Sequence, residues 1–247
     1  MRAVLLETAT WKEAEQFLGE ETVVVIPLGA VCKEHGYHLP LNNDWLMAEY
    51  LKQRVLAEVE DVVVAPTIGH HFYPAFVEYP GSITLRLDTA RDLIVDVCSS
   101  LFRYGPRKFY VLNTGISTVR ALEPAQEALL SQGIALRFCN LHEIFEQVRH
   151  LQEQEGGGHA DEVETSIMLH IAPDVVQMDK AVKEFHPGKG RLTRDPENSD
   201  AVLSHSGVWG DATLASADKG RDFTEALVRE IFAGIKELKL LGMTGDG

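Results

Sequence analysis

The sequence predicts an α/β protein in which helices cover both faces of a mostly parallel sheet. Three observations lead to this fold class. Short β-branched apolar runs, such as TVVVIPL at residues 22–28, lack alternating polar residues, as strands buried on both faces do. Longer segments between them have apolar residues at helical spacing. The two kinds of segment alternate along the chain, which is typical of βαβ units.

Four strands are expected in chain order, at residues 22–28, 62–65, 108–112 and 134–138. The first ends at Pro27 and Gly29, the second stops before Pro66, and the third leads into the turn at residues 113–115. No internal repeat or low-complexity linker divides the chain. We therefore expect a single domain over residues 1–247.

Helices are expected at residues 42–59, 88–104, 118–132, 141–153, 163–169 and 223–241. Asn43 or Asp44 can cap the first of them, and Gly133 closes the third. The last is long and amphipathic. Residues 186–200 are polar and contain Gly and Pro, which predicts a long surface loop.

Composition excludes several classes of protein. Of 247 residues 45% are apolar, so intrinsic disorder is not expected. With 23 basic and 37 acidic residues the net charge is −14, which disfavours binding to nucleic acid or to an anionic membrane. The three cysteines, Cys32, Cys98 and Cys139, suggest neither a disulfide framework nor a CxxC zinc site. No apolar run is long enough for a membrane helix, so we expect a cytoplasmic protein.

Polar clusters follow the predicted strands, at residues 33–44, 69–81 and 113–118, and a fourth lies at 156–165. Ligands of such sheets bind beyond the carboxyl ends of the strands. The first cluster contains Glu34, His35, His38 and Asp44 within eleven residues. Imidazole with carboxylate is a ligand set that suits zinc, manganese or iron. The alternative is a solvated loop with a capping Asp44.

Four segments resemble motifs of the creatininase (creatinine amidohydrolase) family. PLGAVCKEHGYHLPLNND at 27–44 resembles P-x-G-S-x-E-Q-H-G-x-H-L-P-L-x-x-D, and GGHADEVETSIML at 157–169 resembles H-A-G-x-x-E-T-S-x-M-L. GVWGDATLASADKG at 207–220 resembles G-V-x-G-D-P-x-x-A-x-x-x-x-G, and EYPGSITL at 78–85 resembles F-P-G-T-x-x-L. The matches occur in order along most of the chain.

The resemblance implies a three-layer α/β/α domain, often a homohexamer, that hydrolyses a C–N bond of a small, in some cases cyclic, amide. One or two divalent ions would activate the attacking water. His35 and Asp44 keep the spacing of the family's ligands, with Asp44 as the bridging carboxylate. His159 and Glu164 match the positions that assist the chemistry, so both are predicted to be catalytic. Glu164 either orients His159 or ties down the glycine-rich loop.

The chain departs from the family at several positions. Lys33 stands in the slot of a metal-binding Glu, and Glu34 in the following Gln slot. Glu34 either fills the ligand position through a local bulge or pairs with Lys33 or a rim arginine. In NTGIST, Gly115 and Ser117 replace the family's His and Glu, so Ser117 is at best a weak oxygen ligand.

Other side chains are candidates to complete the site. His70 or His71 can serve as a replacement ligand or a substrate contact, the alternative being a hydrogen-bonded loop residue. Lys33 is a candidate contact for a substrate carboxylate, as are Arg86 and Arg120, although such arginines more often form surface ion pairs. Trp209 is a candidate for the pocket wall. Two other functions stay open: a non-catalytic small-molecule-binding protein, and a mononuclear hydrolase of a lactone or formamide.

Overall fold

Five parallel strands form the central sheet, in the order β1-β3-β2-β4-β5. They are β1 (Val4–Leu5), β2 (Val23–Leu28), β3 (Val62–Val64), β4 (Lys108–Asn113) and β5 (Ala135–Phe138). This computed structural model describes residues 2–188 and 190–241. Within these residues, no helix combines the length and apolarity that crossing a membrane requires.

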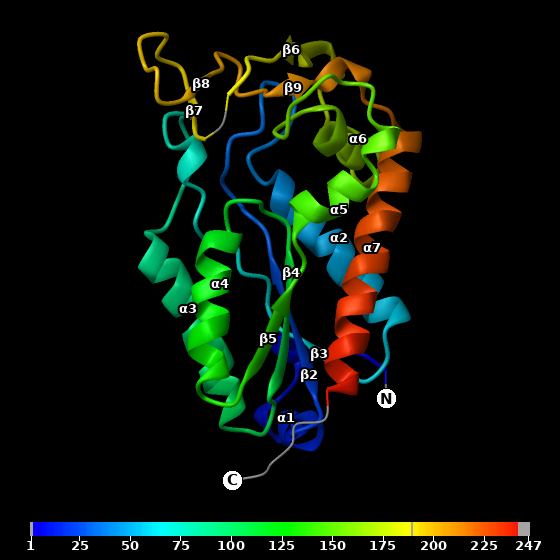
Figure 1. Cartoon of the computed structure of the whole chain (residues 1–247). Coiled ribbons are helices and arrows are strands. Elements are labelled where there is room, and N and C mark those ends of the chain that lie inside the picture. Colours follow the sequence, from blue (N-terminus) through cyan, green and yellow to red (C-terminus); the bar gives the residue numbers. More distant parts are fainter. Residues whose placement is uncertain (1, 189, 242–247) are drawn as a thin grey trace.

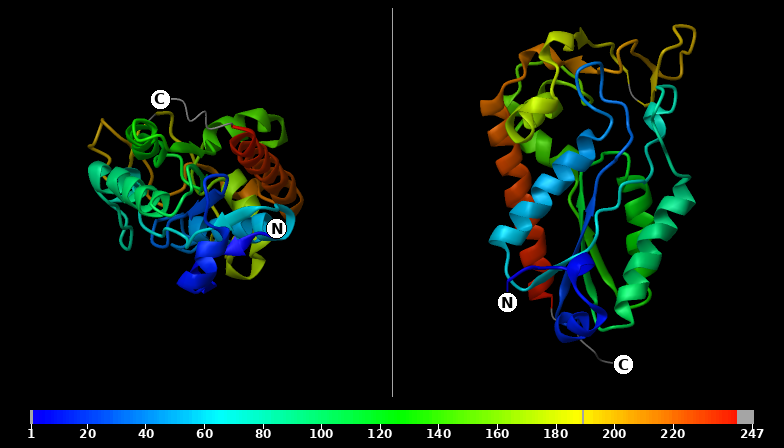
Figure 2. Two further views of the ribbon diagram at one scale, coloured as in Figure 1. Left: turned by 90° about the horizontal axis from the view of Figure 1, so that it is seen from below. Right: turned by 180° about the vertical axis from the view of Figure 1, so that it is seen from behind.

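Helices cover both faces of the sheet, giving three layers (Figures 1 and 2). One face is covered by α3 (Leu87–Phe102) and α4 (Val119–Leu130). The other is covered by α2 (Asn43–Glu58), α5 (Leu141–Gln147), α6 (Glu162–Ile171) and α7 (Ala217–Leu240). The short α1 (Trp11–Phe17) lies at the opposite end of the sheet from the long loops (Figure 1). The predicted α/β class with a mostly parallel sheet is confirmed.

Smaller elements lie mostly in the connections. Two two-stranded sheets pair β6 (Lys183–Glu184) with β9 (Gly210–Asp211) and β7 (Leu192–Thr193) with β8 (Val202–Leu203). Single 3₁₀ turns occur at Leu6–Thr8, Pro74–Phe76, Arg149–Leu151, Pro173–Val175, Met178–Lys180 and Ala212–Leu214.

Strand β2 explains why the apolar runs show no alternation. Val23 and Val25 point into the core beneath α2 and α7, whereas Val24 and Ile26 point into the core beneath α3 and α4. Successive strand side chains face opposite ways, so a strand covered on both faces must be apolar at every position. All six residues of β2 are buried.

The structure corrects several predicted boundaries. Helix α7 begins at Ala217 rather than residue 223, because Ser216 caps a polar first turn by accepting from the Lys219 N–H. Helix α5 ends at Gln147 and is followed by a 3₁₀ turn. Strand β1 and helix α1 were not predicted, although Thr10 and Glu13 form a capping box before α1. The predicted loop at 186–200 includes β7, and its residue 189 lies outside the described residues.

The chain connections around β2 open a crevice at the end of the sheet where a ligand can bind. From β2 the chain passes through α2 to β3 on one side, and it later returns to form β4 on the other side of β2. The loops that follow β2 and β4 therefore diverge, which is where open α/β sheets bind ligands. The long loops gather at this end of the sheet (Figure 1).

Candidate active site

A cluster of charged and imidazole side chains lies where the loop after β2 meets the loop before α6. We call it the active-site cluster, and its members are Lys33, Glu34, His35, Asp44, His159 and Glu164. Five members are buried, and the Glu164 side chain is 11% exposed. The cluster unites the predicted metal ligands with the predicted catalytic pair, although about 115 residues of chain separate Asp44 from His159.

His35 lies between two oxygen atoms that only accept hydrogen bonds. Its Nδ1 is 2.9 Å from the Lys33 carbonyl oxygen, and its Nε2 is 2.7 Å from Asp44 Oδ1. A neutral imidazole has one N–H, so the ring can donate a hydrogen bond to only one of these oxygen atoms. The lone pair of the other nitrogen then faces an oxygen atom, an arrangement that a proton or a metal ion bound to that nitrogen would stabilise.

His159 shows the same arrangement. Its Nε2 is 2.9 Å from the Glu34 carbonyl oxygen and 3.1 Å from Glu34 Oε2. Its Nδ1 is 3.4 Å from Glu164 Oε2. Burial alone would lower the pKa of His159, but the charges of Glu34 and Glu164 outweigh it and raise this pKa to about 9. The ring is thus surrounded by negative charge at both nitrogen atoms.

Three members of the cluster have the geometry of a metal-ligand group. One ligand atom from each of His35, His159 and Glu164 lies within 4.8 Å of the others. Two imidazoles and a carboxylate suit zinc and other divalent ions. Each ring also has an oxygen acceptor for its other nitrogen, as metal-ligating histidines usually do. The residues present therefore fit one divalent ion.

Lys33 and Asp44 form a buried ion pair, with 2.7 Å between Lys33 Nζ and Asp44 Oδ2. Burial opposes both charges. The attraction of Asp44 nevertheless raises the pKa of Lys33, and Lys33 and His35 together lower the pKa of Asp44. Asp44 lies in the first turn of α2, where the helix dipole also favours a negative charge.

Glu34 is held by its local backbone rather than by Lys33. Its carboxylate accepts from the Gly36 N–H and contacts His159. Gly207 packs against it with a φ of 84°, and a Cβ at that position would lie 1.8 Å from Glu34 Oε1. A glycine is therefore needed at 207 for both its backbone conformation and the close approach.

Glu164 contacts the groups that both of its predicted alternatives involve. Its Oε2 faces His159 Nδ1, and the same oxygen accepts from the Ala160 N–H at 2.6 Å. Ala160 has a φ of 47°, so this contact anchors a strained turn at the end of the glycine-rich loop. His159 and Lys33 hold the pKa of Glu164 well below its usual value, although burial opposes them.

His38 links the loop after β2 to α6. Its Nε2 is 2.7 Å from Thr165 Oγ1, and burial together with the charge of His35 lowers its pKa to about 4. His38 therefore helps to fix the position of the loop after β2 relative to α6.

The loop after β4 brings no ionisable side chain to the cluster. The Ser117 hydroxyl donates to the Phe72 carbonyl oxygen at 2.9 Å. A Cβ at Gly115 would lie 2.9 Å from Thr118 Cγ2 and 3.4 Å from Tyr73 Cε1, so a side chain there would displace its neighbours. Ser117 as a weak ligand stays a prediction.

The histidine pair after β3 divides between surface and interior. His70 is exposed and His71 is fully buried. Neither belongs to the ligand group found among the described residues, and recruitment of one of them as a ligand stays a prediction. Burial lowers the pKa of His71 to about 4.

We expect His71 to make the protein less stable in mild acid. Below pH 6.5 His71 becomes protonated in the unfolded chain, whereas in the folded chain it stays neutral down to about pH 4. The free energy of unfolding therefore decreases as the pH is lowered from 6.5 to 4. Between pH 7 and pH 5 the loss due to His71 is roughly 2 kcal/mol. Urea unfolding of the wild type and of His71→Leu at both pH values would measure it. Parallel pH profiles of the two proteins would contradict the expectation.

A cavity of about 180 Å³ opens beside the cluster. Its lining includes Lys33, Phe76, Ser117, His159, Glu164 and Trp209. Trp209 is positioned by backbone hydrogen bonds with the loop of His159, and its ring stacks on Phe185. Phe76 packs 4.1 Å from the His159 ring, measured between centroids. Sequence reasoning missed Phe76, because a single aromatic residue in a loop gives no periodic signal.

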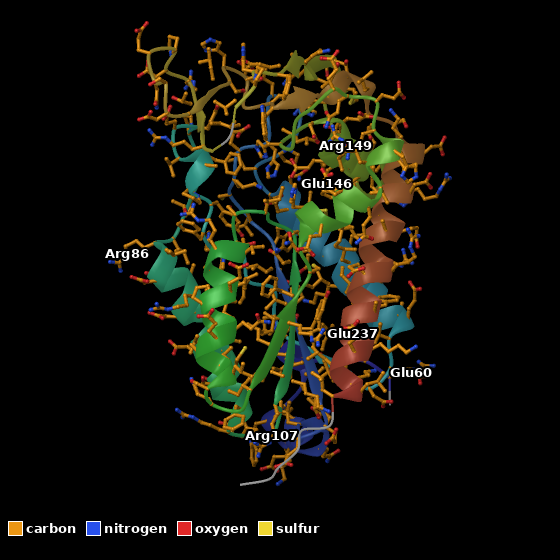
Figure 3. All side chains as sticks on the ribbon, in the orientation of Figure 1. Glu60, Arg86, Arg107, Glu146, Arg149 and Glu237 are labelled. Atoms are coloured by element: carbon orange, nitrogen blue, oxygen red, sulfur yellow. The ribbon has the colours of Figure 1, made fainter. Side chains whose placement is uncertain are left out.

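Sequence reasoning also missed Asp161, which caps α6 by accepting from the Val163 and Glu164 N–H groups. Burial, reinforced by the charge of Glu164, raises its pKa to about 6. Its position directly before a helix was the available signal. Arg86, by contrast, extends from the start of α3 away from the rest of the molecule (Figure 3), on an exposed part of the chain.

This fold also occurs in known proteins. The model of the family described as creatininase, creatinine amidohydrolase, matches residues 7–235. This chain belongs to the creatininase family. A solved structure of a creatinine amidohydrolase (creatininase) aligns with 98% of this chain and 100% of its own, with a TM-score of 0.79 and 23% identity, and thus shares the fold.

Curated creatininase-family relatives differ in what they act on. A 3-dehydro-scyllo-inosose hydrolase of Thermotoga maritima is 28% identical over 91% of this chain and 80% of its own length. A mycofactocin precursor peptide peptidase of Mycolicibacterium smegmatis is 28% identical over 82% of this chain and 80% of its own. Both are named for hydrolysis, and their substrates are chemically unlike.

Proposed function

We propose that this chain is a metal-dependent amidohydrolase that cleaves a C–N bond of a small amide. The observation that supports this most is the orientation of the two imidazoles. His35 and His159 each place one nitrogen against an oxygen acceptor and turn the other toward a carboxylate. Since one ligand atom from each of His35, His159 and Glu164 lies within 4.8 Å of the others, we assign these three side chains as the ligands of one divalent ion.

The remaining side chains define the chemistry around the ion. When bound, a divalent ion supplies Lewis-acid activation of water and of a substrate carbonyl. Glu34 and the Lys33 carbonyl oxygen keep the two rings in position. Glu164 also lines the cavity, so a substrate bound there would lie next to the proposed ion. Lys33 and Trp209 are the proposed substrate contacts, since both line the same cavity.

The size of the cavity favours a small substrate. About 180 Å³ lies below the usual range for ligand pockets, which is roughly 300–1,000 Å³. Zinc, manganese and iron are all compatible with imidazole and carboxylate ligands. The homohexamer and the cytoplasmic location expected from the sequence stay predictions.

Metal content and turnover test this function together. We expect purified protein to contain a bound divalent ion by mass spectrometry, and to hydrolyse at least one member of a panel of small linear and cyclic amides. A chelator should abolish turnover, and added zinc or manganese should restore it. Thermal stabilisation by panel compounds without turnover, in a protein that takes up no metal, would instead support the binding-protein alternative.

A further inference from the structure

The ammonium group of Lys33 is a buried cation held in a fixed position within the active-site cluster. Its side chain is 5% exposed, and Nζ lies 2.7 Å from Asp44 Oδ2. The rings of Phe76 and Tyr73 flank it, with centroids 4.9 and 5.8 Å from Nζ. Such faces favour a desolvated cation. Among the described residues, Asp44 is the one carboxylate within ion-pair distance of this ammonium.

Both oxygens of Asp44 are thereby engaged. Oδ1 faces the His35 ring and Oδ2 faces the Lys33 ammonium. To bridge two metal ions, Asp44 would have to give up its contact with Lys33. A second ion would then lie next to a buried positive charge, which is strongly unfavourable at low dielectric.

The net charge of the active-site cluster also disfavours a second metal ion. It contains three carboxylates and one ammonium, which leaves two negative charges when both imidazoles are neutral. One divalent ion neutralises this remainder, whereas two would leave the buried cluster strongly positive. The loop after β4 also provides no ionisable ligand, and Gly115 has no free space for a larger side chain.

We propose that the Lys33 ammonium occupies the position of a second metal ion, so that this chain binds one divalent ion where the family resemblance implies up to two. The inference rests on the proposed metal-dependent function. It makes Lys33 the second cation of the active site, fixed to Asp44 and exposed to the substrate cavity. It also separates this chain from hydrolases that hold two ions at such a cluster.

Titration with Mn²⁺ and with Zn²⁺, followed by calorimetry and by metal analysis after dialysis, tests the proposal. We expect one equivalent for the wild type and for Lys33→Arg, which keeps the charge. Lys33→Glu should gain a second, weaker equivalent, because two carboxylates then face the vacated position. Lys33→Met should bind the first ion at least about tenfold more tightly, because a nearby positive charge is gone.

Lys52→Met is the matched control. Lys52 is also buried and paired with a carboxylate, Glu7 at 2.8 Å, but it does not belong to the cluster. Its replacement should leave metal stoichiometry and affinity unchanged. Thermal unfolding with and without metal would show that each variant is folded. If Lys33→Glu does not fold, the affinity of Lys33→Met decides the question by itself.

The outcomes separate this inference from the proposed function. Two equivalents in the wild type would overturn the role of Lys33 and leave a metal-dependent hydrolase. One equivalent in both the wild type and Lys33→Glu, with unchanged affinity in Lys33→Met, would do the same. No ion in the wild type but uptake by Lys33→Glu would support the role of Lys33 and refute the proposed metal dependence. No uptake by any variant would refute both.

Discussion

Replacing His159 with Gln is expected to remove the bound ion and to lower amide hydrolysis by about 10³-fold. His159 provides one of the three proposed ligand atoms, and its ring also lines the substrate cavity. Without the ring, Glu34 and Glu164 lose the group that lies between them. Metal analysis of the purified variant, together with initial rates on the best amide of the panel, would measure both effects.

A second histidine on the neighbouring helix is the control for this substitution. His170 lies near the end of α6, packs edge-on against Tyr50, and is outside the cluster. His170→Gln should keep both metal and activity. A His159→Gln protein that keeps its metal but loses turnover would identify His159 as the catalytic residue predicted from the sequence rather than as a ligand. Full activity in this variant would exclude both roles.

Replacing Gly220 with Ala is expected to destabilise the protein by about 3 kcal/mol. Gly220 lies in the first turns of α7, where a Cβ would lie 1.8 Å from the Ser166 carbonyl oxygen of α6. The two helices would have to move apart, because the Ser166 carbonyl oxygen belongs to the backbone of α6 and cannot rotate away as a side chain could. Intrinsic helix propensity alone predicts the opposite sign, since Ala is favoured over Gly by about 1 kcal/mol within a helix.

Thermal unfolding would measure this effect, with an expected fall in Tm of roughly 6–12 °C for a chain of this size. Gly19→Ala is a suitable control, because the nearest atom to its Cβ would be Thr22 Oγ1 at 3.9 Å. A Gly220→Ala protein as stable as the wild type would mean that α6 and α7 can separate at little cost. Because α6 also bears Glu164, a partly separated pair should show reduced metal affinity as well.

The two faces of the sheet show how far the sequence alone determines the fold. The apolar run of β2 and the helical spacing in α2, α3 and α4 predict buried parallel strands between covering helices, and the structure confirms them. The apolar pattern did not predict elements that are only partly buried or that begin with a polar, capped turn. The first turn of α7 is one such place, and the short β1 and α1 are others. Apolar periodicity is weak in all of them, so the apolar pattern alone does not reveal them.

The same division applies to the candidate site. The side chains with the relevant chemistry are all recognisable in two sequence motifs, namely Lys33, Glu34, His35, Asp44, His159 and Glu164. Their partners, in contrast, follow from the packing of the folded chain: Lys33 pairs with Asp44, and Glu34 pairs with His159. Spacing along the chain limits which residues can meet, but the loops after β2 and before α6 belong to different parts of the fold. Which carboxylate neutralises which cation therefore depends on how those loops pack over the end of the sheet.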